Sequence, residues 1–178
     1  MKTRSLARTA LMAVTTFVAG LIRLPLGPVP FTLQTLLVLL TGLLLKPSEA
    51  FSALLLHLAL KLAFYGLGDL LSPSFGFVIA FIPAAWLLAL LTSRRGRMNG
   101  WVYLDTALAS LVIYLIGIPY LALILHYLGA FSSLGWGGLL QGSFLIFLPG
   151  DLFKALLAIF LAGRIRPLLE QEKIRLQP

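Results

Sequence analysis

Two residues of opposite charge, Asp151 and Lys154, lie three positions apart in a long apolar stretch. On a helix they share one face, so they can form an ion pair. A charge within the hydrocarbon of a membrane is costly unless it has a partner or meets water. The pair therefore either holds a membrane helix in register or lines a cavity for a polar solute.

The residues directly before this pair favour the cavity. Pro149 and Gly150 interrupt a helix and free backbone groups, which membrane proteins tolerate where the chain borders a cavity. A helix that begins near Asp151 also points its positive dipole end toward an anion. We therefore interpret Asp151 and Lys154 as candidate substrate-binding residues.

A proline-rich segment at 25–30 cannot lie inside a helix, because its three prolines force an extended or turned chain. Thr32 and Gln34 follow it and open the next apolar stretch. The segment fits an ordinary outer loop with a polar cap and, equally, a rigid loop that folds over a pocket. In the second case Thr32 and Gln34 become binding residues.

Aromatic residues supply further candidates. Phe75 and Phe77 follow a second outer turn at 71–74, and they fit interfacial anchors or flat surfaces that stack on a solute. Tyr120 can pack on the rings of a solute in the same way. We keep all three as candidate binding residues.

Other polar residues inside apolar stretches have simpler interpretations. Lys61 and Tyr65 form an i, i+4 pair; we expect Lys61 to snorkel toward the outer surface, and we keep Tyr65 as a candidate binding residue. Asp69 is expected to be solvated. His57 and His126 have no carboxylate or cysteine at ligand spacing, so we expect buried, hydrogen-bonded side chains and no metal site.

Small and hydroxyl residues suggest two more hypotheses. Ser5, Thr9 and Ala13 recur every four positions, a stripe that lets a second helix approach closely, either within the bundle or on a partner subunit. Ser143 could act as the nucleophile of an intramembrane hydrolase. A nucleophile needs a base held by a third group, and the spacing offers none, so we assign no catalytic residue.

The composition identifies the solvent of this chain as lipid. Of its 178 residues 60% are hydrophobic and 11% charged, whereas about a quarter are charged in ordinary soluble domains. The net charge of +8 is spread in short runs between apolar stretches and forms no basic groove with exposed aromatics, which argues against nucleic acid. The absence of cysteine excludes disulfides and thiolate metal sites.

A membrane-spanning helix needs about 20 apolar residues, and the sequence predicts six spans, of which the second is short. We expect one compact all-α bundle that forms a single transmembrane domain over residues 1–178, with a kink or break near Pro119. The predicted spans are 6–23, 31–45, 49–67, 75–92, 101–127 and 139–163.

The positive residues predict the orientation. With a cytoplasmic N-terminus, eleven of the fourteen Lys and Arg residues fall on the inner side, and the loops near 24–30, 68–74 and 128–138 contain none. Both termini should therefore face the cytoplasm. The inner residues are Lys2, Arg4, Arg8, Lys46, Arg94, Arg95, Arg97, Arg164, Arg166, Lys173 and Arg175.

Three motifs in this order resemble the BioY family, the biotin-specific substrate-binding (S) components of energy-coupling factor (ECF) transporters. Residues 28–35, Pro-Val-Pro-Phe-Thr-Leu-Gln-Thr, are similar to the family's P-V-P-x-T-x-Q-T. Residues 114–120 resemble its fifth-helix segment, and residues 149–154 resemble its P-G-D-x-x-K. Residues 72–77 depart from the family's G-P-[TS]-G-G-Y, since they lack one glycine and the tyrosine.

The resemblance implies a six-helix S-component in the cell membrane of a prokaryote, with biotin as its ligand and no cofactor or enzyme activity. It also implies partners, namely an ECF transmembrane subunit and two ATPases. The sequence has no G-x-x-x-x-G-K-[ST] phosphate loop of its own, which agrees with an external energy source. The alternatives are an S-component for another vitamin or small anion, an intramembrane hydrolase, and a structural membrane protein.

Overall fold

The computed structural model describes residues 3–25, 29–96 and 98–175, with the backbone alone at 133–134 and 170–175. Predictions for Lys2, for residues 26–28 and for Arg97 therefore lie outside the described residues. The same holds for the side chains of Lys173 and Arg175.

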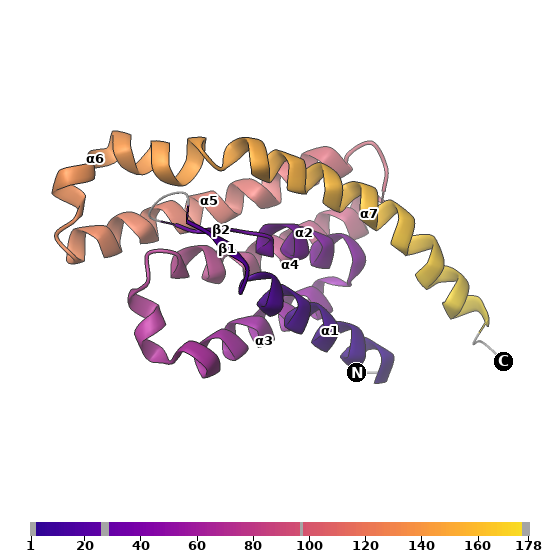
Figure 1. Ribbon diagram of the computed structural model, residues 1–178. Coiled ribbons are helices and arrows are strands. Elements are labelled where there is room, and N and C mark those ends of the chain that lie inside the picture. Colours follow the sequence, from indigo (N-terminus) through magenta and orange to yellow (C-terminus); the bar gives the residue numbers. More distant parts are fainter. Residues whose placement is uncertain (1–2, 26–28, 97, 176–178) are drawn as a thin grey trace.

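The described chain is almost wholly helical (Figure 1). Its α-helices are α1 (Thr3–Ala19), α2 (Gln34–Leu44), α3 (Pro47–Tyr65), α4 (Phe75–Arg95), α5 (Val102–Tyr127), α6 (Phe131–Leu140) and α7 (Leu148–Arg175). Shorter elements are the 3-10 helix η1 (Leu67–Leu71), the π-helical segment η2 (Gln141–Leu145) and the paired strands β1 (Arg23–Leu24) and β2 (Phe31–Thr32).

Within the described residues, four stretches are long and apolar enough to cross a membrane: α3, α4, α5 and the region Gly135–Leu169, which includes α7. The predicted first span is α1, which ends at Ala19, and the predicted second span is only the 11 residues of α2. Phe31 and Thr32 pair with β1 instead of entering α2. The second span is therefore shorter than predicted, because its first residues form a strand.

Helix α4 lies at the centre of the bundle and packs against α5, α3 and α2. Its buried face is rich in alanine, with Ala80, Ala84, Ala85 and Ala89 shielded from solvent. Small side chains let neighbouring helices approach closely, which is how membrane helices gain packing energy. α2 lies between α4 and α7, and α1 packs mainly on α3.

The proline in α5 does not break that helix, contrary to one of our two expectations. α5 is one helix from Val102 to Tyr127 with Pro119 inside it. The interruption occurs instead between α6 and α7, where η2 widens the helix before α7 begins at Leu148. Helix breaks in membrane proteins are tolerated where the freed backbone groups are buried in protein or face a cavity.

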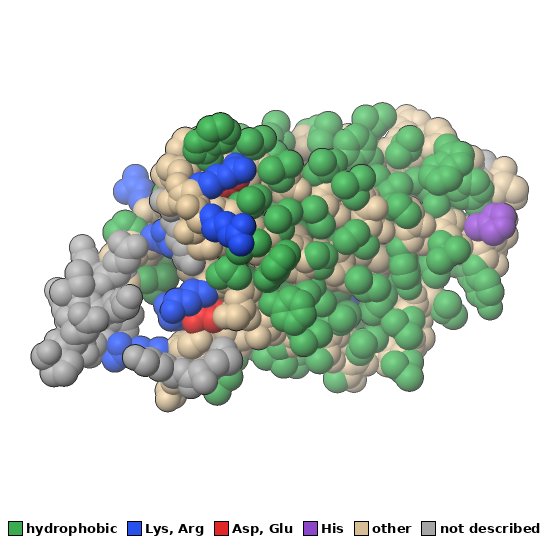
Figure 2. Space-filling view, turned by 180° about the vertical axis from the view of Figure 1, so that it is seen from behind, with side chains coloured by type: hydrophobic (Ala, Val, Ile, Leu, Met, Phe, Trp, Pro, Cys, Tyr) green, Lys and Arg blue, Asp and Glu red, His purple; other side chains and the backbone are tan. Residues whose placement is uncertain are grey.

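On one face of the molecule, charged and apolar side chains are separated along the long axis (Figure 2). Figure 2 shows Lys and Arg side chains gathered at one end of the visible face and hydrophobic side chains over most of the remainder. Figure 1 places the start of α1 and the end of α7 at the same end of the bundle. The apolar surface includes large exposed side chains such as Leu123, Phe153 and Phe160, as expected for a surface that faces lipid.

Candidate substrate cavity

A cavity of about 650 Å³, counting the space at its mouth, lies among α2, α3, α4, α5 and α7 next to the β1–β2 hairpin. Its walls combine aromatic rings with a few polar groups. The polar and charged lining residues are Arg23, Thr32, Gln34, Thr35, Lys61, Ser74, Tyr114, Ser143, Asp151 and Lys154.

Asp151 is held by two donors on the cavity wall. Lys154 donates from Nζ to Oδ1 at 2.8 Å, and the Tyr114 hydroxyl donates to Oδ2. The side chains of Lys154 and Asp151 are 4% and 16% exposed. The predicted pair thus forms and borders a cavity, in the first turns of α7, where the helix dipole is positive.

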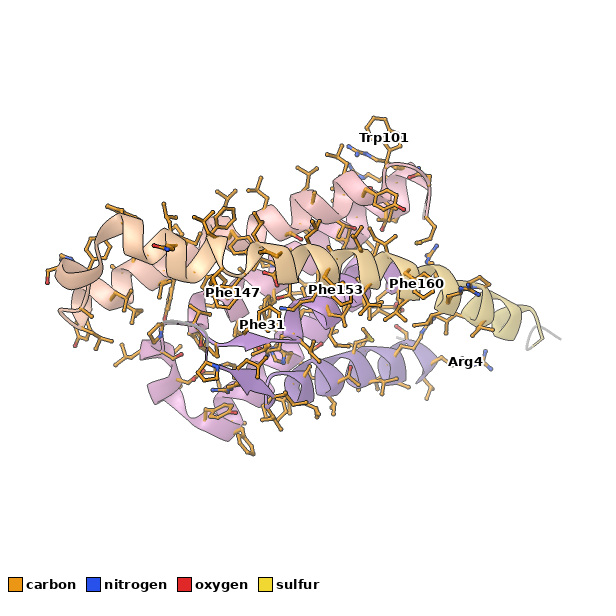
Figure 3. All side chains as sticks on the ribbon, turned by 45° about the horizontal axis from the view of Figure 1, so that its top comes forward. Arg4, Phe31, Trp101, Phe147, Phe153 and Phe160 are labelled. Carbon is orange, nitrogen blue, oxygen red and sulfur yellow. The ribbon has the colours of Figure 1, made fainter. Side chains whose placement is uncertain are left out.

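Phe31 forms the apolar side of this cluster. The Nζ of Lys154 lies 3.5 Å from the centre of the Phe31 ring, and Phe31 stacks on Phe147 with 5.9 Å between ring centres and 10° between planes (Figure 3). Gly150 makes this approach possible, since a Cβ there would stand 2.6 Å from Phe31 Cε2. The glycine before Asp151 therefore makes room for a ring of the hairpin.

The hairpin brings the N-terminal half of the chain to the same cavity. Strands β1 and β2 are antiparallel, with Arg23 opposite Thr32. Val29 is buried in an apolar cluster with Leu121 and Phe147, and Val29 and Pro30 both line the cavity. Two described residues of the proline-rich segment, Val29 and Pro30, therefore lie on the cavity wall.

Gln34 belongs to a short chain of polar contacts. Its Nε2 lies 3.2 Å from Nε2 of His57, its Oε1 accepts from Thr32 Oγ1 at 3.3 Å, and its backbone N–H donates to the same hydroxyl at 3.3 Å. His57 is fully buried and hydrogen-bonded, as predicted. The same prediction is wrong for His126, which is exposed near the C-terminal end of α5. Because the amide NH₂ of Gln34 is the donor, Nε2 of His57 is the acceptor.

The structure brings five of the eight predicted binding residues to the cavity wall: Asp151, Lys154, Gln34, Thr32 and Phe77. The other three, Phe75, Tyr120 and Tyr65, lie elsewhere.

Phe75 is 1% exposed, which excludes the interfacial anchor, and packs against Tyr120 with ring centres 6.2 Å apart. The Tyr120 hydroxyl donates to the carbonyl of Leu70. Tyr65 lines a smaller adjoining pocket of about 160 Å³. These three rings therefore support the wall from outside the main cavity.

Two predictions about charge are wrong. Lys61 does not snorkel to the surface, and Asp69 is not solvated; they form an ion pair, with side chains 7% and 12% exposed. The turn at Gly66, where φ is 77°, lets η1 fold Asp69 back over α3. A buried ammonium is stable only with such a partner. Helical spacing does not predict this contact, because the two residues are eight positions apart in the sequence.

The small-residue stripe of α1 faces into the bundle. Ser5 donates to Oε1 of Glu49 on α3 at 2.5 Å, and Thr9 and Ala13 are buried. The stripe therefore takes part in packing within the bundle, and its role in docking to a second subunit stays a prediction.

Sequence reasoning missed several lining residues. Tyr114 and Phe31 lie within the quoted motifs, but only the fold shows their contacts with Asp151 and Lys154. Arg23 could have been found from the sequence, because it is a cation at the outer end of an apolar helix. Ser143 also lines the cavity, and its hydroxyl donates to the carbonyl of Leu139 at 2.6 Å.

The sequence of this chain is similar to known proteins over most of its length. A family model described as the BioY family matches residues 1–171. A "Probable biotin transporter BioY" of Bacillus subtilis (strain 168) is 38% identical over 170 residues, covering 88% of this chain and 85% of its own. A "Biotin transporter BioY" of Thermotoga maritima is 29% identical over 174 residues, covering 93% of this chain and 97% of its own.

One solved structure has a similar fold. It is described as "the S-component for biotin from an ECF-type ABC transporter", and it is 25% identical in sequence, with a TM-score of 0.69. The match covers 93% of this chain and 92% of the other. The likeness therefore extends over nearly the whole of both proteins.

Proposed function

The chain belongs to the BioY family, and we propose that it is the membrane-embedded subunit that captures biotin for an importer. The observation that carries the proposal is the Tyr114–Asp151–Lys154 cluster on the wall of a cavity inside an apolar bundle. As a member of a transporter family, the chain is a transport subunit and not an enzyme.

The chemistry of the cluster suits the cyclic urea of biotin. That ring offers N–H donors and a carbonyl acceptor side by side. A carboxylate has about four lone-pair sites, and in Asp151 one oxygen accepts from Lys154 and the other from Tyr114. Acceptor capacity therefore remains for a ligand N–H, while Lys154 has further donors for the ligand carbonyl.

The aromatic walls suit the apolar part of the same ligand. Phe31 and Phe147 stack in parallel, and Phe77 lies edge-on to Tyr114 with ring centres 6.3 Å apart. All four rings line the cavity. Flat aromatic surfaces with a few polar groups are the usual lining of small-molecule sites. We propose that Thr32 and Gln34 add polar contacts from the hairpin side.

We extend the proposal to the membrane arrangement, with six spans and both termini in the cytoplasm. The support is the basic end of the bundle, where the described parts of both terminal helices lie (Figures 1 and 2), because cytoplasmic segments are enriched in Lys and Arg. The short helix α2 then crosses the membrane together with the hairpin that precedes it.

We further propose that an ECF transmembrane subunit and two ATPases energise the import. The similar crystal structure is an S-component of an ECF-type ABC transporter, and this sequence has no phosphate loop of its own. The test is biotin uptake by an auxotroph that expresses the chain with and without these partners, and growth on low biotin should require both.

Calorimetry with the purified protein tests the capture step. We expect one biotin per chain and a raised melting temperature at saturating biotin. No heat and no thermal shift would remove the proposal. A thermal-shift screen of other vitamins then tests the runner-up, since tight binding of a different compound with biotin inert would assign the cavity to that compound.

A further inference from the structure

Two cations, Arg23 and Lys61, line a part of the binding space to which Asp151 and Lys154 do not contribute. Arg23 and Lys61 line both the main cavity and the adjoining pocket of about 160 Å³, whose described walls include neither Asp151 nor Lys154. Cζ of Arg23 lies 4.9 Å and Nζ of Lys61 5.3 Å from the centre of the Tyr65 ring. The two positive groups therefore share one side of the binding space.

The charges of the described residues leave this part of the binding space positive. Lys61 is paired with Asp69, a residue of η1 that does not line the cavity. No carboxylate among the described residues forms an ion pair with Arg23, whose Nε donates to the carbonyl of Gly20 at 2.9 Å. Its two terminal nitrogens are thus available in a region where one cation has no counter-charge.

The wall around Asp151 has the reverse preference. Asp151 carries the only carboxylate among the described lining residues, and like charges in a partly desolvated site repel strongly. A ligand carboxylate near Asp151 would face that repulsion, whereas a ligand N–H would be accepted. A solute with N–H donors at one end and a carboxylate at the other can therefore satisfy both parts of the binding space in one direction only.

We propose that Arg23 and Lys61 form a carboxylate subsite, which fixes the direction in which an acidic ligand lies in the cavity. The inference rests on the proposed function, since it assigns the acidic tail of biotin to this subsite and its ring to Asp151. The guanidinium of Arg23 presents a planar pair of N–H donors that matches a carboxylate. Lys61 keeps donors beyond the one that binds Asp69, and Asp69 holds it in place.

A neutral-tail analogue tests this subsite. We would titrate the full-length protein with biotin and with biotinamide, in which an amide replaces the carboxylate. Wild type should bind biotin at least about tenfold more tightly than biotinamide, as expected for a charge-assisted contact. Arg23→Gln should lose about that factor for biotin and bind biotinamide unchanged, which removes the preference.

Two further variants keep the result interpretable. Arg23→Lys retains the charge without the planar fork, so its preference for the acid should be intermediate. Arg164→Gln, at an exposed arginine on α7, should leave both affinities unchanged. Melting temperatures measured for each variant show that the loss is not caused by unfolding.

The outcomes separate this inference from the proposal beneath it. Equal affinity of wild type for biotin and biotinamide, or an equal loss of both in Arg23→Gln, overturns the carboxylate subsite while biotin capture stands. Failure of wild type to bind either compound overturns both. A preference for the acid that disappears in Arg23→Gln supports the subsite.

Discussion

The hydroxyl of Tyr114 on α5 donates a hydrogen bond to the carboxylate of Asp151 on α7, 37 residues further along the chain. The bond joins two helices that contact each other little elsewhere. It also holds the Asp151 carboxylate between the phenol and the ammonium of Lys154. The position of the carboxylate is therefore set by two helices, and each donor can be removed separately.

Tyr114→Phe should weaken biotin binding about three- to tenfold and also lower the melting temperature, because one oxygen of the Asp151 carboxylate loses its donor. The ring keeps its edge-on contact with Phe144, whose centre is 4.9 Å away, while one hydrogen bond to a carboxylate, worth about 1–3 kcal/mol, is lost. Calorimetry measures the affinity. The matched control is Tyr103→Phe, at a tyrosine 59% exposed on the same helix, and equal affinities of both variants with wild type would contradict the role of the hydroxyl.

Asp151→Asn should weaken biotin binding at least tenfold, about 1.4 kcal/mol. The change leaves the buried ammonium of Lys154 without a counter-charge, so the melting temperature should fall as well. Lys154→Ala should have the same two effects. Circular dichroism and size-exclusion chromatography must accompany the titrations, and normal affinity in well-folded variants would remove the pair from the site.

Gly150→Ala should lower stability and biotin affinity together. The added Cβ would meet the Phe31 ring at 2.6 Å, and relief of such overpacking typically costs about 1–3 kcal/mol. Phe31 would have to move away from Lys154 and Phe147. The control is Gly137→Ala in α6, where a Cβ meets nothing within 4 Å; equal melting temperatures for the two variants would show that the Phe31 contact is not limiting.

Lys61→Met should destabilise the protein strongly, because it leaves Asp69 buried without a partner. Breaking such a pair costs on the order of 3 kcal/mol, whereas replacing both members with apolar residues is often neutral. The double variant Lys61→Met, Asp69→Leu should therefore recover most of the melting temperature. A double variant no more stable than Lys61→Met would mean that the two charges act independently.

The orientation in the membrane can be tested with single cysteines, because the natural sequence contains none. Ser132→Cys lies at the exposed start of α6 and Gly100→Cys just before α5, near the basic end. A membrane-impermeant maleimide should label position 132 in intact cells and position 100 only after permeabilisation. The reverse pattern would place the termini outside.

The sequence predicts the long apolar helices well and the interrupted ones poorly. The predicted spans 75–92 and 101–127 nearly coincide with α4 and α5, because uniform apolar runs leave few other conformations in lipid. The last predicted span is divided between α6, η2 and α7. Hydropathy does not register this division, since all three segments are apolar.

The candidate site was predictable where its partners are close in sequence. Asp151 and Lys154 are one helical turn apart, so spacing alone predicted their ion pair, which the structure confirms. Tyr114 and Phe31 reach the same cluster from distant segments, and no local rule brings them there. Lys61 was misjudged for the same reason, because its partner Asp69 approaches through a turn.

Helix α2 has only 11 residues, so at 1.5 Å per residue it is about 16 Å long, roughly half the 30 Å of bilayer hydrocarbon. Its first residue, Gln34, lines the cavity. In the proposed membrane arrangement, a solute that reaches Gln34 would have passed about half of the hydrocarbon layer before any helix moves. The other half of the layer, on the side proposed to be cytoplasmic, is then the part of the path for which metabolic energy would be required.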